Sequence, residues 1–116
     1  MNHFISVSTA AEMTSLLRSQ RENILKTEFQ NDDLIPICET FDKEAFETLL
    51  GKSGCESIRI YYGMTENFKI HAIIVAVDEN DADILPEENA LTEGDFVAEN
   101  GTRCPDLCPP SSPLNS

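Results

Sequence analysis

The sequence predicts an α+β fold, in which two N-terminal helices pack on a small antiparallel sheet built around a central β-hairpin. Apolar residues recur at helical spacing in two segments of the first half, and from residue 57 they follow the two-residue period of strands. The last sixteen residues hold four of the six prolines and two of the four cysteines. Such a segment suits neither a helix nor a central strand, so we expect an extended, Cys/Pro-rich C-terminal tail.

The first helix is predicted over Thr9–Lys26. Thr9 and Glu12 have the spacing of a capping box, in which each side chain satisfies a free backbone N–H of the other residue. The apolar face of this helix consists of Met13, Leu16, Leu17 and Ile24. The next segment, 27–40, is largely polar and contains Pro36, which indicates a linker.

A second helix is predicted to begin after Asp42, a residue type that caps helix N-termini. Phe41 precedes this cap and can pack against Phe46 as a hydrophobic staple. Gly51 or Gly54 can adopt the left-handed backbone that ends a helix. We therefore expect a short helix with one apolar face.

Two strands are predicted after the second helix. Ser57–Gly63 has the alternating pattern of a strand, whereas Lys69–Asp78 is apolar on both faces, as in a strand that is covered on both sides. Only residues 64–68 separate them, which favours an antiparallel hairpin. Asp95–Glu99 is predicted to form a short edge strand.

The 116 residues are enough for one domain, which we expect over 1–108, with an extended or disordered end at 109–116. Eight Lys and Arg against 21 Asp and Glu give a formal net charge of −13. Because this charge repels phosphate backbones and anionic lipids, we expect neither nucleic acid nor a membrane as a partner. The N-terminus lacks the apolar run of a signal peptide, which favours a cytoplasmic location.

Three stretches of the chain carry a resemblance to other proteins: GCESIRIYYG, then IIVAVD followed by a polar turn and DI, then RCPDLCPP. Together they resemble a group of small proteins from Bacteroidota genomes that has no assigned activity. The resemblance covers roughly residues 41–110. It implies a bacterial, cytoplasmic origin and says nothing about chemistry.

Four residues could form a metal site: Cys55, Cys104, Cys108 and His71. Zinc is held by four thiolate or imidazole ligands, and Cys104 and Cys108 could supply the closely spaced pair. Their C-x3-C spacing is less diagnostic than C-x2-C, however, and His71 lies in a crowded strand. A Cys104–Cys108 disulfide is the alternative, although a cytoplasmic location disfavours a permanent bond. A third, structural interpretation makes Cys38 and Cys55 small buried apolar residues and packs the tail across the sheet, with its thiols either reduced or oxidised.

A second candidate site is a polar cluster on the sheet, formed by Arg59, Tyr61 and, from the neighbouring strand, His71. The alternative pairs Arg59 with one of the many carboxylates and makes His71 a hydrogen-bonded core residue. No catalytic residue is assigned, because the sequence lacks nucleophile motifs and a phosphate-binding Gly-rich loop.

These observations predict a small acidic accessory or interaction protein that has no catalytic activity and needs no cofactor. It would act through a sheet edge or face, with a protein partner or as a homo-oligomer. The alternative function is a small metal-binding or thiol-redox module that uses Cys55, Cys104 and Cys108, with zinc as the metal. The tail is expected to be a clasp over the domain, since its prolines limit the conformations of the unfolded chain.

Overall fold

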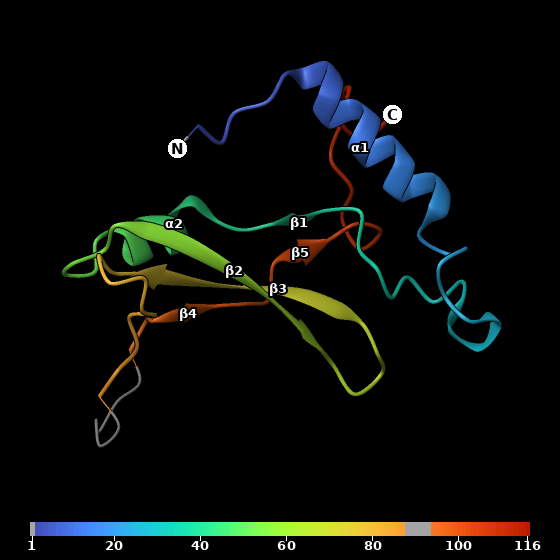
Figure 1. Cartoon of the computed structure of the whole chain (residues 1–116). Coiled ribbons are helices and arrows are strands. Elements are labelled where there is room, and N and C mark those ends of the chain that lie inside the picture. Colours follow the sequence, from blue (N-terminus) through green and yellow to red (C-terminus); the bar gives the residue numbers. More distant parts are fainter. Residues whose placement is uncertain (1, 88–93) are drawn as a thin grey trace. The chain divides into compact units, whose positions relative to one another are not determined.

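The structure is a computed structural model that describes residues 2–87 and 94–116 (Figure 1). It is α+β, with two α-helices and small antiparallel sheets, which confirms the predicted class. The chain divides into two compact units. Unit 1 consists of Met1–Cys38 and Arg103–Ser116, and unit 2 consists of Glu39–Thr102.

The elements, in chain order, are α1 (Val7–Gln20), the 3-10 helix η1 (Thr27–Phe29), β1 (Glu39–Thr40), α2 (Lys43–Leu50), β2 (Ser57–Met64), β3 (Ile70–Val77), β4 (Val97–Ala98) and β5 (Thr102–Arg103). One sheet has the strand order β2-β3-β4, and β1 pairs with β5 in a second sheet. No helix in the described part of the chain is long and apolar enough to cross a bilayer.

Strand β3 is the middle strand of unit 2 (Figure 1). It runs antiparallel to β2, with Ser57 opposite Val77 and Met64 opposite Ile70, and antiparallel to β4 on its other side. Its second half, from Ile74 to its last residue, is buried. A strand that is apolar on both faces thus forms the centre of unit 2, as its sequence pattern requires.

Helix α2 packs on one face of this sheet through Leu49, which is 2% exposed. Leu49 contacts the β3 residues Ile74 and Ala76, and Ile58 of β2 packs against the same cluster. Alternate residues of a strand share a face, so α2 covers the face that carries Ile58.

The ends of α2 agree in part with the prediction. Asp42 occupies the N-cap position, although its side chain makes no capping hydrogen bond. The rings of Phe41 and Phe46 meet edge to face with their centroids 6.1 Å apart, which confirms the predicted contact. Gly51 ends the helix with a right-handed backbone, and Gly54, with φ of 83°, is the left-handed glycine.

Helix α1 is shifted toward the N-terminus from its predicted range. The Oγ of Ser6 accepts the N–H of Thr9 (3.0 Å), so Ser6 is the N-cap and Thr9 lies inside the helix. The helix ends at Gln20 rather than Lys26, where the guanidinium of Arg21 donates to a backbone carbonyl 14 residues later (2.6 Å). None of the residues of α1 is buried.

Arginine side chains bind the C-terminal tail within unit 1. The buried guanidinium of Arg103 donates to the carbonyl of Asp33 (2.9 Å). Arg18 of α1 donates to two carbonyls among the last three residues (2.7 and 2.9 Å). Residues 112–116, where the sequence predicts an extended or disordered end, form a hydrogen-bonded turn.

Candidate functional site

The outer side of β2 is a free strand edge. The N–H of Thr65 donates to the carbonyl of Lys69 (3.0 Å), so the odd-numbered residues of β2 direct their backbone groups toward β3. The outward-pointing N–H and C=O groups belong to Ile58, Ile60, Tyr62 and Met64, which we call the β2 edge. No strand among the described residues pairs with it.

Most side chains of the β2 edge are exposed to solvent. The exposed fraction is 49% for Ile60, 77% for Tyr62 and 63% for Met64, whereas Ile58 packs beside α2. A long edge strand with exposed apolar side chains is a template for pairing with another strand, and proteins normally protect such edges. The β2 edge lacks a proline and carries no charged side chain.

The other margin of the β2–β3 hairpin is protected. Strand β4 covers the middle of β3. Beyond one end of β4, the N–H of Ile84 donates to the carbonyl of Ala76 (2.9 Å). Beyond the other end, the N–H of Ala72 donates to the carboxylate of Glu39 (3.1 Å). In the described structure, the β2 edge is therefore the unprotected edge of this hairpin.

A polar cluster ties β2 to the turn that follows β3. The Arg59 guanidinium contacts the carboxylates of Asp81 and Asp83, each at 2.6 Å. The hydroxyl of Tyr61 donates to the second carboxylate oxygen of Asp83. The sequence predicted a carboxylate partner for Arg59 without identifying it, because nothing local in the sequence shows that this turn folds back onto β2.

These contacts shift three pKa values in directions that favour the cluster. The hydrogen bond from Tyr61 lowers the pKa of Asp83, and Arg59 lowers it further. The same bond raises the pKa of Tyr61, because Asp83 accepts the phenolic proton. Hydrogen bonding to Asp83 raises the pKa of Arg59. All groups are satisfied by one another, which indicates a structural cluster rather than a catalytic one.

His71 contacts a different partner from the residues of this cluster. Its Nδ1 is 3.2 Å from a carboxylate oxygen of Glu99, without the alignment of a hydrogen bond. In the strand register, His71 stands opposite Gly63, which is four pairs along the ladder from the pair of Arg59 and Val75. The structure therefore joins Arg59 and Tyr61 through an aspartate and gives His71 a different partner.

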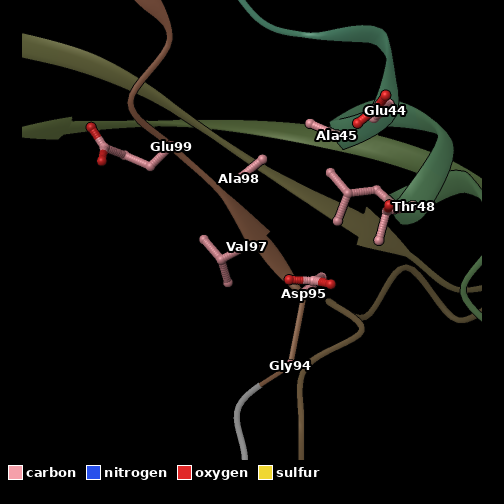
Figure 2. A pocket seen from close by; sticks show the side chains of 9 residues that line it. Glu44, Ala45, Thr48, Gly94, Asp95, Val97, Ala98 and Glu99 are labelled. Carbon is pink, nitrogen blue, oxygen red and sulfur yellow. The ribbon is translucent and has the colours of Figure 1, made fainter.

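A cavity of about 380 Å³ lies between α2 and the segment that leads into β4. Figure 2 shows Glu44 and Thr48 projecting from α2, with Asp95 and Val97 on the opposite wall. Glu99 lines its far end, so the lining is acidic. Among the described residues, however, no three His, Cys, Asp or Glu side chains are placed to hold a metal ion.

The predicted zinc ligands fall in different units. Cys55 and His71 belong to unit 2, whereas Cys104 and Cys108 belong to unit 1. Cys104 and Cys108 are joined by a disulfide, so neither is available as a thiolate ligand while this bond is intact. The Cys55 thiol donates to the carbonyl of Ser57 (3.4 Å) and packs against the core. The zinc site stays a prediction.

Cys38 is the cysteine that the structure brings to the tail. The N–H of Cys104 donates to the carbonyl of Cys38 (3.4 Å), and the Cys38 thiol is free and half-buried. Sequence reasoning treated Cys38 as a small apolar residue. Because 66 positions separate the two cysteines in the chain, no local spacing could indicate their contact.

Comparison with known proteins supplies no relative: no protein-family model, no curated protein and no solved structure matches this chain. The resemblance to small Bacteroidota proteins stays a prediction. What the chain does must therefore follow from the chemistry of the β2 edge and of its cysteines.

Proposed function

We propose that this chain is a small acidic interaction protein without catalytic activity, which binds an extended segment of a protein partner along the β2 edge. The observation that carries the proposal is the open edge of an eight-residue strand, with its exposed apolar side chains. We further propose a bacterial cytoplasm as its location, from the sequence resemblance.

Strand addition suits the chemistry of this edge. The four outward N–H and C=O groups can form a ladder with any extended backbone, which supplies affinity without requiring a particular sequence. Ile60, Tyr62 and Met64 all lie on one face of the sheet, so they favour a partner segment with apolar residues at alternate positions. No cofactor takes part in such binding.

Charge favours a foreign partner over a second copy. Unit 2 contains fifteen Asp and Glu but four Lys and Arg, a net charge of −11 of the −13 in the chain. Two copies paired edge to edge would bring two such charges together, whereas a segment flanked by Lys or Arg would be attracted. Self-association is the competing outcome, and sedimentation velocity at low and high salt distinguishes it.

The variant Ile60→Pro tests the proposal. The N–H of Ile60 points away from β3, so proline removes a donor from the β2 edge while the ladder to β3 keeps all its bonds. Ile60→Thr is the matched control, because it keeps the N–H and strand propensity. We expect proteins captured from the native host by the wild type to be retained by Ile60→Thr and lost with Ile60→Pro.

Amide hydrogen exchange then locates the binding. A captured partner should slow exchange in residues 57–64 of the wild-type chain. If Ile60→Pro, shown folded by circular dichroism, captures the same partners as the wild type, or if exchange in 57–64 is unchanged, the β2 edge is not the binding surface.

A thiol-redox module is the second candidate, and the observation that favours it is the Cys104–Cys108 disulfide. Thiol titration and elemental analysis of freshly purified protein separate the candidates. Two free thiols and no metal support redox chemistry alongside binding. Four free thiols without metal remove it. One zinc per chain, with unfolding on chelation, would instead support the metal-binding alternative and contradict the interaction proposal as stated.

A further inference from the structure

We infer that Cys38, Cys104 and Cys108 form a thiol–disulfide exchange site in unit 1, whose substrate is a thiol. Its central step transfers the disulfide from Cys104–Cys108 to Cys38–Cys104 and releases Cys108 as a free thiol. The inference does not depend on the β2 edge, and it replaces Cys55 of the sequence prediction with Cys38.

The strand register places Cys38 beside the disulfide. Cys38 directly precedes β1 and Cys104 directly follows β5, and the hydrogen bond between their backbones continues the pairing of these two strands. Residues that form a hydrogen-bonded antiparallel pair lie on the same face, with Cα atoms about 5.5 Å apart. The Cα atoms of disulfide-bonded cysteines are usually about 4.4–6.8 Å apart, so this separation allows a bridge.

Burial makes the two sulfurs of the disulfide unequal. Cys104 is 7% exposed, whereas Cys108 is exposed to solvent. A thiol from outside the chain can therefore approach Cys108, and Cys38 is the thiol placed to reach Cys104. Cys38 also lines a cavity of about 330 Å³ with Pro109 and Leu114 of the tail, which gives its side chain room to move.

The exchange is balanced without an added oxidant or reductant. The Cys38 thiolate attacks the sulfur of Cys104, and the Cys38–Cys104 bond forms as the Cys104–Cys108 bond breaks. The electron pair of the broken bond stays on Cys108, which takes up the proton that Cys38 lost. In the starting state, an external thiolate can attack the exposed sulfur of Cys108 instead; a mixed disulfide forms on Cys108 as the Cys104–Cys108 bond breaks, and Cys104 leaves as the thiolate. The substrate class is therefore small-molecule or protein thiols.

Contacts within unit 1 hold the reacting groups in place. Arg103, next to Cys104, is buried and donates to the carbonyl of Asp33 (2.9 Å). Arg18 holds the end of the tail through two carbonyls. Between Cys104 and Cys108, the N–H of Leu107 donates to the carbonyl of Arg103 (2.9 Å). Opening this segment breaks that bond, while the Arg103 guanidinium still holds Cys104 in position beside Cys38.

Trypsin converts the exchange into a change of cross-link. Cleavage after lysine and arginine places Cys38 in peptide 27–43, Cys55 in peptide 53–59, and both tail cysteines in peptide 104–116. The starting disulfide lies inside one peptide. The exchanged disulfide joins 27–43 to 104–116, so mass spectrometry distinguishes the two states directly.

The experiment uses the full chain, purified without reductant and held at pH 8, where thiolates are populated. Aliquots are trapped with N-ethylmaleimide over time, denatured and digested. We expect the cross-link between peptides 27–43 and 104–116 to appear together with maleimide-labelled Cys108, at a rate independent of protein concentration. Cys38→Ser should abolish the cross-link and the labelling of Cys108, whereas Cys55→Ser should change neither.

Three results would overturn the inference. The first is a wild-type chain with four labelled cysteines, which would mean that no disulfide exists. The second is an intact Cys104–Cys108 bond with Cys108 never labelled. The third is labelling of Cys108 that persists in Cys38→Ser.

A variant that traps the exchanged disulfide provides a second, independent test. Cys108→Ser cannot form the starting disulfide, so within unit 1 an oxidant can join Cys104 only to Cys38. Oxidised glutathione should therefore produce the cross-link between peptides 27–43 and 104–116. Glutathione attached to Cys104 without this cross-link, or a bond from Cys38 to Cys55, would count against the placement of Cys38. Circular dichroism before oxidation establishes that the variant is folded.

Discussion

Asp83 connects two side chains of β2 to the turn after β3, since it accepts from both Arg59 and Tyr61. Its pKa is lower in the folded chain, so the unfolded chain binds the proton more readily. The stability that this carboxylate supplies is therefore present above the unfolded pKa and is lost as the pH falls through the folded pKa.

We expect Asp83→Asn to unfold at a lower urea concentration than the wild type at pH 7. The gap between the two midpoints should narrow as the pH is lowered below about 4, where the wild-type carboxylate also becomes neutral. Urea titrations at several pH values from 3 to 7 measure it. A gap of constant size at pH 3 and pH 7 would show that the charge of Asp83 is not what stabilises the cluster.

Two neighbouring leucines of α2 provide a matched test of the core. Leu49 is 2% exposed and packs on β3, whereas Leu50 is 57% exposed. Leu49→Ala should lower the free energy of unfolding by about 2–5 kcal/mol, because it removes buried methyl groups and leaves a cavity. Leu50→Ala should change it by less than about 1 kcal/mol. Equal losses in chemical denaturation would contradict the assignment of the buried face.

Residue-level prediction from the sequence succeeds where the partner is close along the chain. The contact between Phe41 and Phe46 follows from their spacing around a helix start. Arg59 is predicted to pair with a carboxylate, but the choice of Asp81 and Asp83 depends on how a later turn folds back onto β2. The sequence contains no local signal for that choice.

Among the elements, α1 offers a test of where a helix begins. Ser6 and Thr9 are both good N-cap residues, and the structure selects Ser6, whose Oγ accepts the N–H of Thr9. Ser6→Ala should therefore lower the stability of unit 1 by roughly 0.5–2 kcal/mol. Glu12→Ala removes the side chain that the sequence assigned to a capping box and is the control. A larger loss from Glu12→Ala, followed by circular dichroism, would restore the predicted cap.

The two long strands are better predicted here than the ends of α1, whereas the predicted strand Asp95–Glu99 is longer than β4, and neither β1 nor β5 was predicted. The expected ranges Ser57–Gly63 and Lys69–Asp78 differ from β2 and β3 by one residue at most at each end. The alternation of polar and apolar residues marks Ser57–Gly63, and a continuous apolar run bounded by charged residues marks Lys69–Asp78. The end of α1 depends instead on the hydrogen bond from Arg21 to a backbone carbonyl 14 residues later. The spacing of apolar residues gives no indication of this bond.

At the scale of the whole molecule, we expect the C-terminal tail to stabilise unit 1. Deleting Arg103–Ser116 removes the buried guanidinium, the disulfide and the partners of Arg18. We expect the Tm to fall by several degrees, at roughly 4–8 °C for each kcal/mol lost. Amide hydrogen exchange should accelerate in α1 while β2 and β3 keep their protection.

Arg18→Gln is the milder control for this deletion, because it removes only the bonds to the last three residues. It should lower the Tm less than the deletion does. An unchanged melting curve for the deleted chain would show that the tail contributes nothing to folding.

Composition and periodicity predict the α+β class of the molecule, but they do not reveal its division into two units. The sequence predicted a single domain over 1–108. In the structure, the first 38 residues and the last 14 together form one compact unit. That grouping depends on contacts such as Arg103 with Asp33, between residues 70 positions apart. The sequence predicted binding through a sheet edge or face but did not identify the strand. Whether the edge of a strand is open depends on which other strands lie beside it in the folded chain.

Unit 1 is assembled from the two extremes of the chain, and synthesis on the ribosome gives this arrangement an order in time. Every residue of unit 2 is joined to the chain before Arg103 is translated, whereas unit 1 stays incomplete until the last segment is made. Until the last segment emerges, Arg18 and Asp33 in the first part of unit 1 lack the partners that they have in the tail. Cys38 thus remains a thiol without its later neighbours while the 66 residues up to Cys104 are translated, and in that interval it can react with the redox couples of the cell.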